Sequence, residues 1–449
     1  MISPLLDWVD NRLGTAHFVS HAMRKAFPDH WSFLLGELNA YAFFILVATG
    51  TFLALFFDPS ASVTRYHGPY ALLAGVPVSR AYLSALRLSF EVPNGLLIRQ
   101  VHHWTALIFV GGIVLHLCRI FFTGAFRKPR EINWLIGSSL FGLAMLAGFT
   151  GYSIPDDLLS GVGLRIADAV VLSIPLVGTR LSTWLLGGAF PSEQMIPRIF
   201  VAHVYLIPAT IAALIAAHVA IVWRQKHTQF PGPGRTEHNV VGLPLFPNYA
   251  LKSAALLCGL VAVVFALGAL VQINPIWLWG PYSASDVVNP AQPDWYIGWI
   301  EGALRLGPPL SLRVFNHSVP SPFWPAVALP ALLGALLVLW PWIEAAVTRD
   351  RAEHHLLASP PLRTAIGAAG IGFAGTLLLA GGDDVQARYL HAPVETLVAF
   401  YRAACLIVPL TAFGITFAIA REVRAHRARP LRIRLRRNVR GGFDEEVIE

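Results

Sequence analysis

Four histidines occupy two apolar segments of the chain at nearly equal spacings. His102 and His116 are separated by fourteen positions in the first segment, and His203 and His218 by fifteen in the second. On an α-helix, 14 residues end about 40° short of four turns and 15 residues about 60° past them, so each pair shares one face, about 21 Å apart along the axis. His103 points about 140° away from His116 and is expected on another face. Ionisable side chains in apolar segments of this kind are costly and by default mark a functional site.

Two helices that each carry two histidines at matching separations can supply a pair of imidazoles at each of two levels. Histidine is an axial ligand of haem iron, and the neutral imidazole is the form that binds metal. Bis-imidazole ligation at both levels is what two stacked b-type haems require. Isolated histidines bonded to backbone are the alternative, which the repeated spacing disfavours. Zinc is disfavoured because the levels lie too far apart for one ion and lack cysteines or nearby carboxylates.

Glycines repeat the same spacing in two other apolar segments. Gly36 and Gly50 are separated by fourteen positions, and so are Gly137 and Gly151. Glycine is a common packing device in membrane helices, so either pair alone carries little weight. Because both pairs match the histidine spacing, we expect these glycines to let the backbone approach each porphyrin.

Three arginines lie close to the histidines in the sequence. Arg99 precedes His102 by three residues, and Arg119 follows His116 by three. Arg198 precedes His203 by five. Guanidinium groups can pair with haem propionates. The alternative is that they extend to the lipid headgroups.

The composition is that of an integral membrane protein. The 449 residues are 55% hydrophobic, only 13% are charged, and the mean hydropathy is +0.57. Soluble proteins carry about 25% charged residues. The net charge of +8 does not indicate nucleic-acid binding, because nine arginines gather in "REVRAHRARPLRIRLRRNVR" near the C-terminus and others flank apolar runs. Membrane topology accounts for this distribution. No CxxC or CxxCH occurs, so a covalently bound c-type haem is not expected.

Eight apolar segments are long enough to cross a bilayer, which needs about 20 residues. They cover residues 34–57, 95–123, 133–154, 197–224, 250–273, 322–346, 363–381 and 396–420. The positive-inside rule places both termini in the cytoplasm. The long loops 155–196 and 274–321 are rich in Pro and Gly, and we expect them to contain short helices and functional groups.

Several motifs together resemble cytochrome b of the respiratory quinol–cytochrome c oxidoreductases. They are "GLLIRQVHHW…LHLCR", "NWLIG…GFTGYSIP", "RIFVAHV…AAHV" and "NPAQPDWYIGWIEGALRL". The resemblance covers roughly residues 30–345. The segment "RQKHTQFPGPGRTEHNVVG" looks most like the actinobacterial branch, in which the complex joins a terminal oxidase directly.

The resemblance implies an all-α membrane protein in which a four-helix bundle encloses two stacked b-type haems. It pairs His102 with His203 at the outer, low-potential haem and His116 with His218 at the inner, high-potential haem. Quinol would be oxidised at an outer site. One electron would pass to a Rieske iron–sulfur protein, and the other would cross both haems to quinone at an inner site.

The same resemblance places the outer quinol site at a Pro-Glu-Trp-Tyr motif, which reads Pro293-Asp294-Trp295-Tyr296 here. Asp294 is one methylene shorter than the usual Glu. Quinol oxidation releases protons, which a carboxylate within reach can accept. The catalytic candidates are Asp294, Tyr296 and Tyr152, and Gly163 lies in the segment that walls this pocket in relatives. Without its context, "PDWY" is equally typical of an interfacial aromatic belt.

The inner quinone site departs from the family pattern. Relatives often carry a Lys-Asp pair at the start of the fifth span, where this chain has Lys252-Ser253. We name Lys252 and His227 as candidate quinone-site residues.

The predicted organisation has four parts: a cytoplasmic amphipathic segment 1–33, a haem bundle 34–225, a C-terminal membrane part 226–420 that carries the PDWY loop, and a basic cytoplasmic tail 421–449. Expected partners are a Rieske protein, a cytochrome c-type subunit and a terminal oxidase, in a dimeric complex of the plasma membrane that uses menaquinone. The alternatives are a di-haem membrane anchor of a dehydrogenase, which leaves "PDWY" unexplained, and a proton-coupled transporter, which usually shows repeated halves.

Overall fold

A computed structural model of the chain describes residues 3–286, 292–314, 317–428, 432–437 and 443–448. Within these ranges, eight helices are long and apolar enough to cross a membrane, which confirms the predicted number. They are Trp31–Ala54, Gly95–Thr123, Glu131–Ser153, Met195–Gln225, Leu245–Leu270, Trp324–Thr348, Pro361–Ala380 and Val394–His426. The largest differences from the predicted ends are the start of the fifth span, at Leu245 instead of residue 250, and the end of the eighth, at His426 instead of residue 420.

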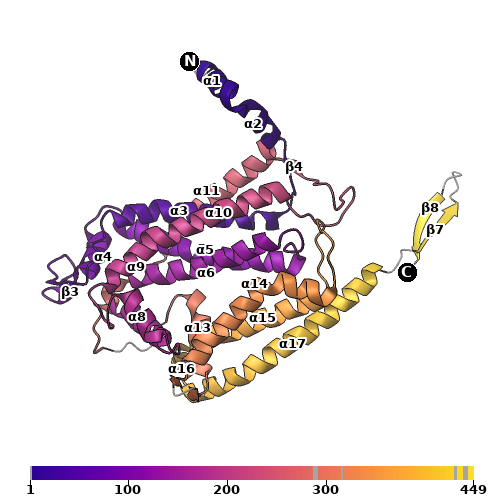
Figure 1. Cartoon of the computed structure of the whole chain (residues 1–449). Helices are drawn as coiled ribbons and strands as arrows, with labels where there is room; N and C mark the ends of the chain where they lie inside the picture. The colour runs from indigo at the N-terminus through magenta and orange to yellow at the C-terminus, as the bar shows by residue number, and fades with distance from the viewer. Residues whose placement is uncertain (1–2, 287–291, 315–316, 429–431, 438–442, 449) are drawn as a thin grey trace.

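The first four spans form a bundle (Figure 1). α5 (Gly95–Thr123) packs against α3 (Leu35–Ala54) and α6 (Glu131–Ser153), and α10 (Ile207–Gln225) packs against α6. α10 continues a membrane helix that starts with α9 (Met195–Val201) and passes through a π-helical turn, η3 (Ala202–Leu206). The fifth span consists of η4 (Leu245–Tyr249) and α11 (Ala250–Leu270), and α11 packs on α3 and α5. α5 is therefore the central helix.

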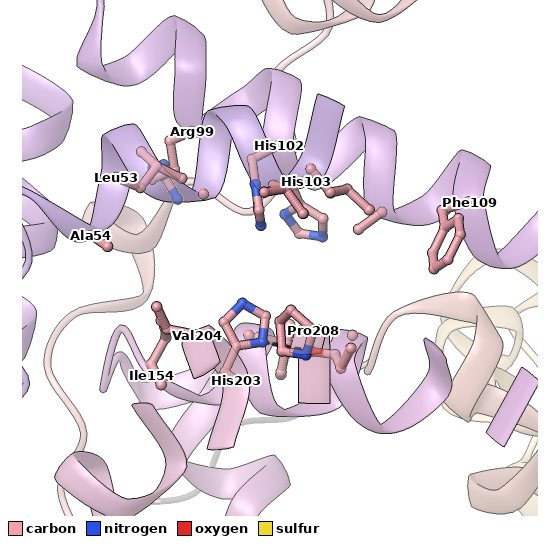
Figure 2. A pocket seen from close by; sticks show the side chains of 18 of the residues that line it. Leu53, Ala54, Arg99, His102, His103, Phe109, Ile154, His203, Val204 and Pro208 are labelled. Atoms are coloured by element: carbon pink, nitrogen blue, oxygen red, sulfur yellow. Dashed lines mark hydrogen bonds between the residues drawn. The ribbon is translucent and has the colours of Figure 1, made fainter. Parts of the chain in front are cut away.

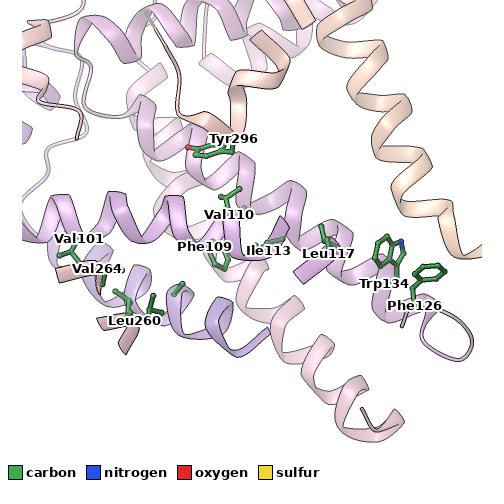
Figure 3. Packing of buried hydrophobic residues seen from close by; sticks show 13 residues of the cluster. Val101, Phe109, Val110, Ile113, Leu117, Phe126, Trp134, Leu260, Val264 and Tyr296 are labelled. Carbon is green, nitrogen blue, oxygen red and sulfur yellow. The ribbon is translucent and has the colours of Figure 1, made fainter. Parts of the chain in front are cut away.

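The buried core follows α5, whose apolar side chains contact neighbouring helices along its length. Figure 3 shows side chains of α5 meeting those of α11 and α6 along this core. The α5 members are Val101, Phe109, Val110, Ile113 and Leu117, the α11 members Leu260 and Val264, and the α6 members Trp134 and Ala144. α5 ends at Gly124, whose φ of +65° is a left-handed conformation that glycine adopts without steric cost.

The last three spans pack beside the bundle (Figure 1). They are α14 (Leu329–Thr348), preceded by η5 (Trp324–Ala328), α15 (Pro361–Ala380) and α17 (Val394–Ala428). α14 contacts α6, and α15 contacts α17. A shorter helix, α13 (Trp295–Leu306), lies on α15, where Gly302 meets the backbone of Leu377. The PDWY motif therefore ends in the first turn of a helix held by the C-terminal spans.

A charged cluster also fixes α13. Arg305 binds Glu301 at 2.6 Å, Asp383 at 2.5 Å and Asp384 at 3.0 Å. Asp384 in turn accepts a hydrogen bond of 2.7 Å from Gln292, two residues before Asp294. Both aspartates begin α16 (Asp383–Leu390), between α15 and α17. The segments before and after Asp294 are thus tied to the same loop.

The long loops contain short helices, as predicted. The first of them holds α7 (Leu158–Leu172) and α8 (Gly178–Leu186), and the second holds α12 (Ile276–Trp279), α13, β5 (Leu312–Val314) and β6 (His317–Val319). The segment between the first two spans forms β2 (Val63–Arg65), η2 (Ala71–Leu73), β3 (Pro77–Ser79) and α4 (Arg80–Phe90). β2 and β3 pair antiparallel, as do β5 and β6.

The N-terminal segment and the tail are more structured than predicted. The former contains α1 (Ser3–Leu13), α2 (Thr15–Met23), β1 (Ala26–Phe27) and η1 (Trp31–Phe33), and β1 pairs with β4 (Leu243–Pro244). The tail forms a hairpin of β7 (Arg432–Arg437) and β8 (Phe443–Ile448), in which Arg434 is in register with Glu446. Tail residues 429–431, 438–442 and 449 lie outside the described residues. The four-part division of the chain stays a prediction.

Candidate functional site

The four histidines meet as two pairs, one at each level of the bundle. The ring centroids of His102 and His203 lie 6.3 Å apart. Those of His116 and His218 lie 6.5 Å apart. Figure 2 shows His102 on α5 and His203 on the opposite helix facing each other across a cavity. A metal ion bonded to two imidazole nitrogens at about 2 Å each would hold the ring centroids about 6 Å apart. Each pair is therefore spaced to hold one metal centre between its rings.

A π-helical turn explains why two different spacings produce two matching pairs. His203 lies in this turn, Ala202–Leu206, whereas the segment between His102 and His116 is continuous α-helix. A π-turn holds one residue more than an α-turn, and such turns are frequent at functional sites. The π-turn at His203 therefore accommodates the extra residue between His203 and His218. As a result, both histidines of the fourth span still face their partners on α5.

Each of the four glycines lies against one of the histidine rings. A Cβ atom on Gly36 would lie 3.4 Å from Cε1 of His116, and one on Gly50 would lie 3.1 Å from Cε1 of His102. A Cβ atom on Gly137 would lie 3.5 Å from Cε1 of His218. A Cβ atom on Gly151 would overlap the ring of His203. The glycines therefore leave room for the imidazoles, and Gly50 and Gly151 also line the outer cavity.

Two threonines orient the outer histidines. The hydroxyl of Thr49 lies 2.9 Å from Nδ1 of His102, and that of Thr150 lies 3.2 Å from Nδ1 of His203. Nδ1 of His203 also lies 3.0 Å from the carbonyl oxygen of Ala147. Partners at Nδ1 leave Nε2 free to bind a metal, the usual arrangement around a ligating histidine.

The sequence contains a signal for this arrangement that the predictions missed. Thr49-Gly50 precedes His102, and Thr150-Gly151 precedes His203, and the separation from threonine to histidine is 53 positions in both cases. The first two spans and the third and fourth spans thus share the same arrangement of threonine, glycine and histidine. A search for recurring dipeptides at a fixed distance from the histidines would have found it.

A cavity of about 250 Å³ adjoins the outer pair. His102 and His203 line it, together with His103, Asp294, Tyr296 and Tyr152. Arg99, Asn274 and Pro155 line it as well. The structure thus brings the outer imidazole pair and the predicted catalytic candidates to one cavity.

Asp294 accepts hydrogen bonds from α5 and from the first turn of α13. Nε2 of His103 lies 3.1 Å from both of its carboxylate oxygens. The hydroxyl of Tyr296 donates to Oδ2 at 3.1 Å. Burial and the neighbouring Asp294 carboxylate raise the pKa of Tyr296 well above its usual value, so this hydroxyl stays protonated and acts as a donor. His103 was given no role from the sequence, although its position on a second face of α5 was the available signal.

The other predicted outer residues lie around this cavity. A Cβ atom on Gly163 would lie 3.6 Å from Cε1 of Tyr152, which places Gly163 behind the cavity wall. The indole of Trp295 packs on Gly111 of α5, and its ring centroid lies 6.0 Å from that of Tyr296. Pro293 directly precedes Asp294 at the start of α13.

The three arginines differ in their surroundings. Nε of Arg99, and Nε and Nη2 of Arg119, are buried without a hydrogen-bond partner in the described part of the chain. Arg198 instead donates to the carbonyl oxygen of Trp184 and does not line the outer cavity. A buried guanidinium is stable only with an anionic or hydrogen-bonding partner. Arg99 and Arg119 therefore have donors available for an acidic group.

The residues present fit a b-type haem at each level. The ring spacing suits a shared metal centre at each level, and at the outer level the Nδ1 partners leave Nε2 free. The arginines offer donors for two acidic groups. Among the residues that the structure describes, no cluster of three or more His, Cys, Asp or Glu could hold a metal ion alone. The paired histidines are therefore suited to a metal that brings its own equatorial ligands.

The inner candidates lie apart from each other. Lys252, in the first turn of α11, forms an ion pair of 2.5 Å with Asp29. His227 is packed against Phe27, with ring centroids 4.9 Å apart. Phe27 in turn stacks on Tyr249, with centroids 4.6 Å apart. Among the described residues, no hydrogen bond or ion pair links the two candidates.

Comparisons with known proteins agree with this geometry. Residues 107–281 match the family model described as "Cytochrome b(N-terminal)/b6/petB". The chain is similar to proteins named cytochrome bc1 complex cytochrome b subunit. The one from Mycobacterium leprae is 48% identical over 91% of this chain and 75% of its own length, and that from Streptomyces coelicolor is 46% identical over 91% and 76%. The one from Corynebacterium diphtheriae is 47% identical over 92% and 76%.

A solved structure has the same fold. A chain of a hyperthermophilic respiratory Complex III matches with a TM-score of 0.70 and 21% identity, over 92% of this chain and 99% of that one. With the identity and coverage of the curated relatives, the family is established. The chain belongs to the cytochrome b subunits of cytochrome bc1 complexes, the quinol–cytochrome c oxidoreductases of the respiratory chain.

Proposed function

We propose that this cytochrome b oxidises quinol in the outer cavity and reduces quinone at an inner site, with two b-type haems between them. His102 and His203 would hold the outer haem, and His116 and His218 the inner one. The observation that carries the proposal is the shared cavity, which has an imidazole pair and a hydrogen-bonded carboxylate in its wall. The haems supply one-electron carriers.

The residues of the outer cavity provide what quinol oxidation requires. A quinol loses two electrons and two protons when it becomes a quinone. The Asp294 carboxylate can accept a proton, and His103 beside it holds the carboxylate in place. The hydroxyl of Tyr296 donates to Oδ2 and orients the carboxylate. A quinol bound in this cavity would lie within reach of Asp294, which can accept one of its protons, and beside His102, one of the residues that would hold the outer haem.

The ring of Tyr296 forms one side of the cavity. Gly148 on α6 leaves room for this ring. Arg99 at the cavity wall has a free donor for a haem propionate.

The partners and the orientation follow from the family resemblance and the charge distribution. We infer that one electron per quinol passes to a Rieske protein and onward to a cytochrome c-type subunit, within a dimeric complex that also contacts a terminal oxidase. The likeness to actinobacterial subunits favours menaquinol as the substrate. Eight spans place both termini on one side, and the basic inner loops favour the cytoplasm.

The decisive experiment is a redox titration of visible spectra of the purified complex. Two b-type components are expected, and His203→Ala and His218→Ala should each remove a different one. His67→Ala is the control, because this exposed histidine lies outside the spans. Quinol oxidation should in addition require the Rieske subunit. Spectra that are unchanged in both ligand variants would contradict the proposal.

A further inference from the structure

Reduction of quinone at the inner site needs protons, and the two candidates named from the sequence are poor sources. Burial and the nearby cations Arg119 and Lys25 lower the pKa of His227 to about 4. The ring is therefore neutral near pH 7 and holds no additional proton to donate. Lys252 is already paired with Asp29, and both side chains are about half exposed (48% and 52%). Another titratable group must serve the buried part of this site.

Glu37 is a half-buried carboxylate in the first turn of α3, near one end of the first membrane span. The hydroxyl of Tyr249 donates to its Oε1 at 2.5 Å, and the hydroxyl of Ser253 donates to Oε2. The hydroxyl oxygens of Tyr41 and Ser253 lie 2.5 Å apart. A serine hydroxyl has one proton, so Ser253 accepts from Tyr41 while it donates to Glu37.

The position of Glu37 connects this network with the inner histidine pair and with water. It follows Gly36, whose missing Cβ leaves room for the ring of His116. On the other side, Ser253 adjoins Lys252, which reaches the surface with Asp29. Glu37 thus neighbours, along the chain, a glycine packed on the inner histidine, and its partner Ser253 neighbours the ion-paired Lys252. His227 and Phe27 extend the same cluster through their stacking with Tyr249.

We propose that Glu37 is the proton-donating group of the inner quinone site, with Ser253, Tyr41 and Tyr249 as the hydroxyls that orient it. The inference rests on the proposed function. The carboxylate of the inner site would thus come from α3, and α11 would contribute the hydroxyl of Ser253.

In the proposed step, one quinone gains two electrons and two protons and becomes one quinol, and each electron originates from a quinol oxidised at the outer site. The Glu37 carboxylate first takes up a proton from the inner aqueous phase, and an O–H bond then forms at a quinone carbonyl oxygen as the O–H bond of the resulting carboxylic acid breaks. The carboxylate then regains a proton from the inner aqueous phase past Lys252 and Asp29. The second proton follows the same path after this reprotonation.

The test uses the purified complex and two readouts. Infrared difference spectra, recorded as the bound quinone is reduced electrochemically, should contain a carboxylic-acid C=O band that Glu37→Gln abolishes. In the same variant, multiple-turnover quinol oxidation should fall about 100-fold, as expected for loss of an acid catalyst, whereas the first turnover at the outer site keeps its rate. Glu422→Gln is the control, because this exposed carboxylate lies in the last turns of α17.

A carboxylate swap sharpens the test. Glu37→Ser combined with Ser253→Asp moves the carboxylate from α3 to α11 within one hydrogen-bonded network, and it should restore both the band and multiple turnover. Tyr249→Phe keeps the carboxyl group and should shift the band. A band and a turnover rate that persist in Glu37→Gln, or a band that Tyr249→Phe leaves unmoved, would overturn the role of Glu37. If the parent complex shows no inner-site turnover at all, the proposed function itself fails.

Discussion

Nε2 of His103 lies 3.1 Å from both carboxylate oxygens of Asp294, although the two residues are 191 positions apart in the chain. The preceding residue, His102, belongs to the outer imidazole pair. Adjacent residues of α5 thus face two different partners, the imidazole of His203 and the carboxylate of Asp294. Under the proposed function, a single helix would then carry residues for both the electron and the proton that leave the quinol.

Removal of the Asp294 charge should stop proton acceptance in the outer cavity. We expect Asp294→Asn to lower quinol oxidation about 100-fold, the usual scale for loss of a general base, and to leave both b-type spectral components unchanged. Steady-state kinetics with the purified complex and its visible spectrum measure the two effects. Asp294→Glu should retain most activity, because it keeps a carboxylate within reach of His103.

Asp286→Asn is the matched control for Asp294→Asn, because it removes the charge of an exposed aspartate in the same outer loop. Activity of Asp294→Asn equal to that of this control would exclude Asp294 as the acceptor.

Substitution of the ring-contacting glycines should affect one level at a time. Gly151→Ala adds a Cβ that overlaps the ring of His203, so we expect the outer b-type component to be lost or its redox potential to shift, while the inner component is retained. Gly142→Ala on the same helix adds a Cβ with no atom within 4 Å and should change neither. Redox titration of the spectrum distinguishes the variants. Equal spectra for both would argue against the ring contact.

Asp157 should make the stability of the complex depend on pH. This fully buried residue caps α7, and burial raises its pKa from 3.8 to about 6. Between these two pH values the folded state holds more protons than the unfolded state, so the free energy of unfolding falls as the pH rises from about 4 to about 6. Above about pH 6, the free energy of unfolding has fallen by its full amount, about 3 kcal/mol.

Asp157→Asn removes this ionisation and keeps an oxygen that can accept the capping hydrogen bond. We expect the variant to unfold at a higher temperature than the parent above pH 6, and at a similar temperature near pH 4. Thermal unfolding of the detergent-solubilised complex over this range provides the measurement. A variant that is less stable than the parent at pH 7.5 would refute the prediction.

The cluster around Arg305 should position Asp294 without taking part in the chemistry. Asp384→Ala removes the acceptor for Gln292 and one partner of Arg305. We expect it to reduce kcat/KM for quinol by roughly 10- to 100-fold through misplacement of Asp294, with unchanged spectra. Asp384→Asn, which can still accept from Gln292, should lose less. Equal losses in the two variants would show that the hydrogen bond to Gln292 is not what matters.

The number of spans and the residues of both histidine pairs could be predicted from the sequence because they depend on local periodicity. Apolar length identifies a membrane helix, and a spacing close to four whole helical turns identifies a shared face. The meeting of His102 with His203 across the bundle follows from the family resemblance and is consistent with the observed ring distance. The roles of these residues toward haem stay predictions.

Contacts between distant segments could not be predicted in this way. Glu37 meets Tyr249 and Ser253 from 212 and 216 positions away in the chain, and nothing in the local pattern of α3 distinguishes it from a helix-end carboxylate. His103 was placed on a separate face of α5, but its partner at the start of α13 depends on how the C-terminal spans pack. The hairpin in the tail depends on backbone pairing between β7 and β8, which the excess of arginine in the sequence obscured.

The π-turn at His203 also limits how the bundle can change during evolution. One residue inserted into an α-helix between the two levels would rotate everything beyond it by about 100° and carry one histidine off the shared face. The fourth span holds such an additional residue and tolerates it because Ala202–Leu206 widens locally. The distance between the two levels therefore behaves as a fixed length, and insertions or deletions in these helices are compatible with both pairs only where the backbone can absorb them within one turn.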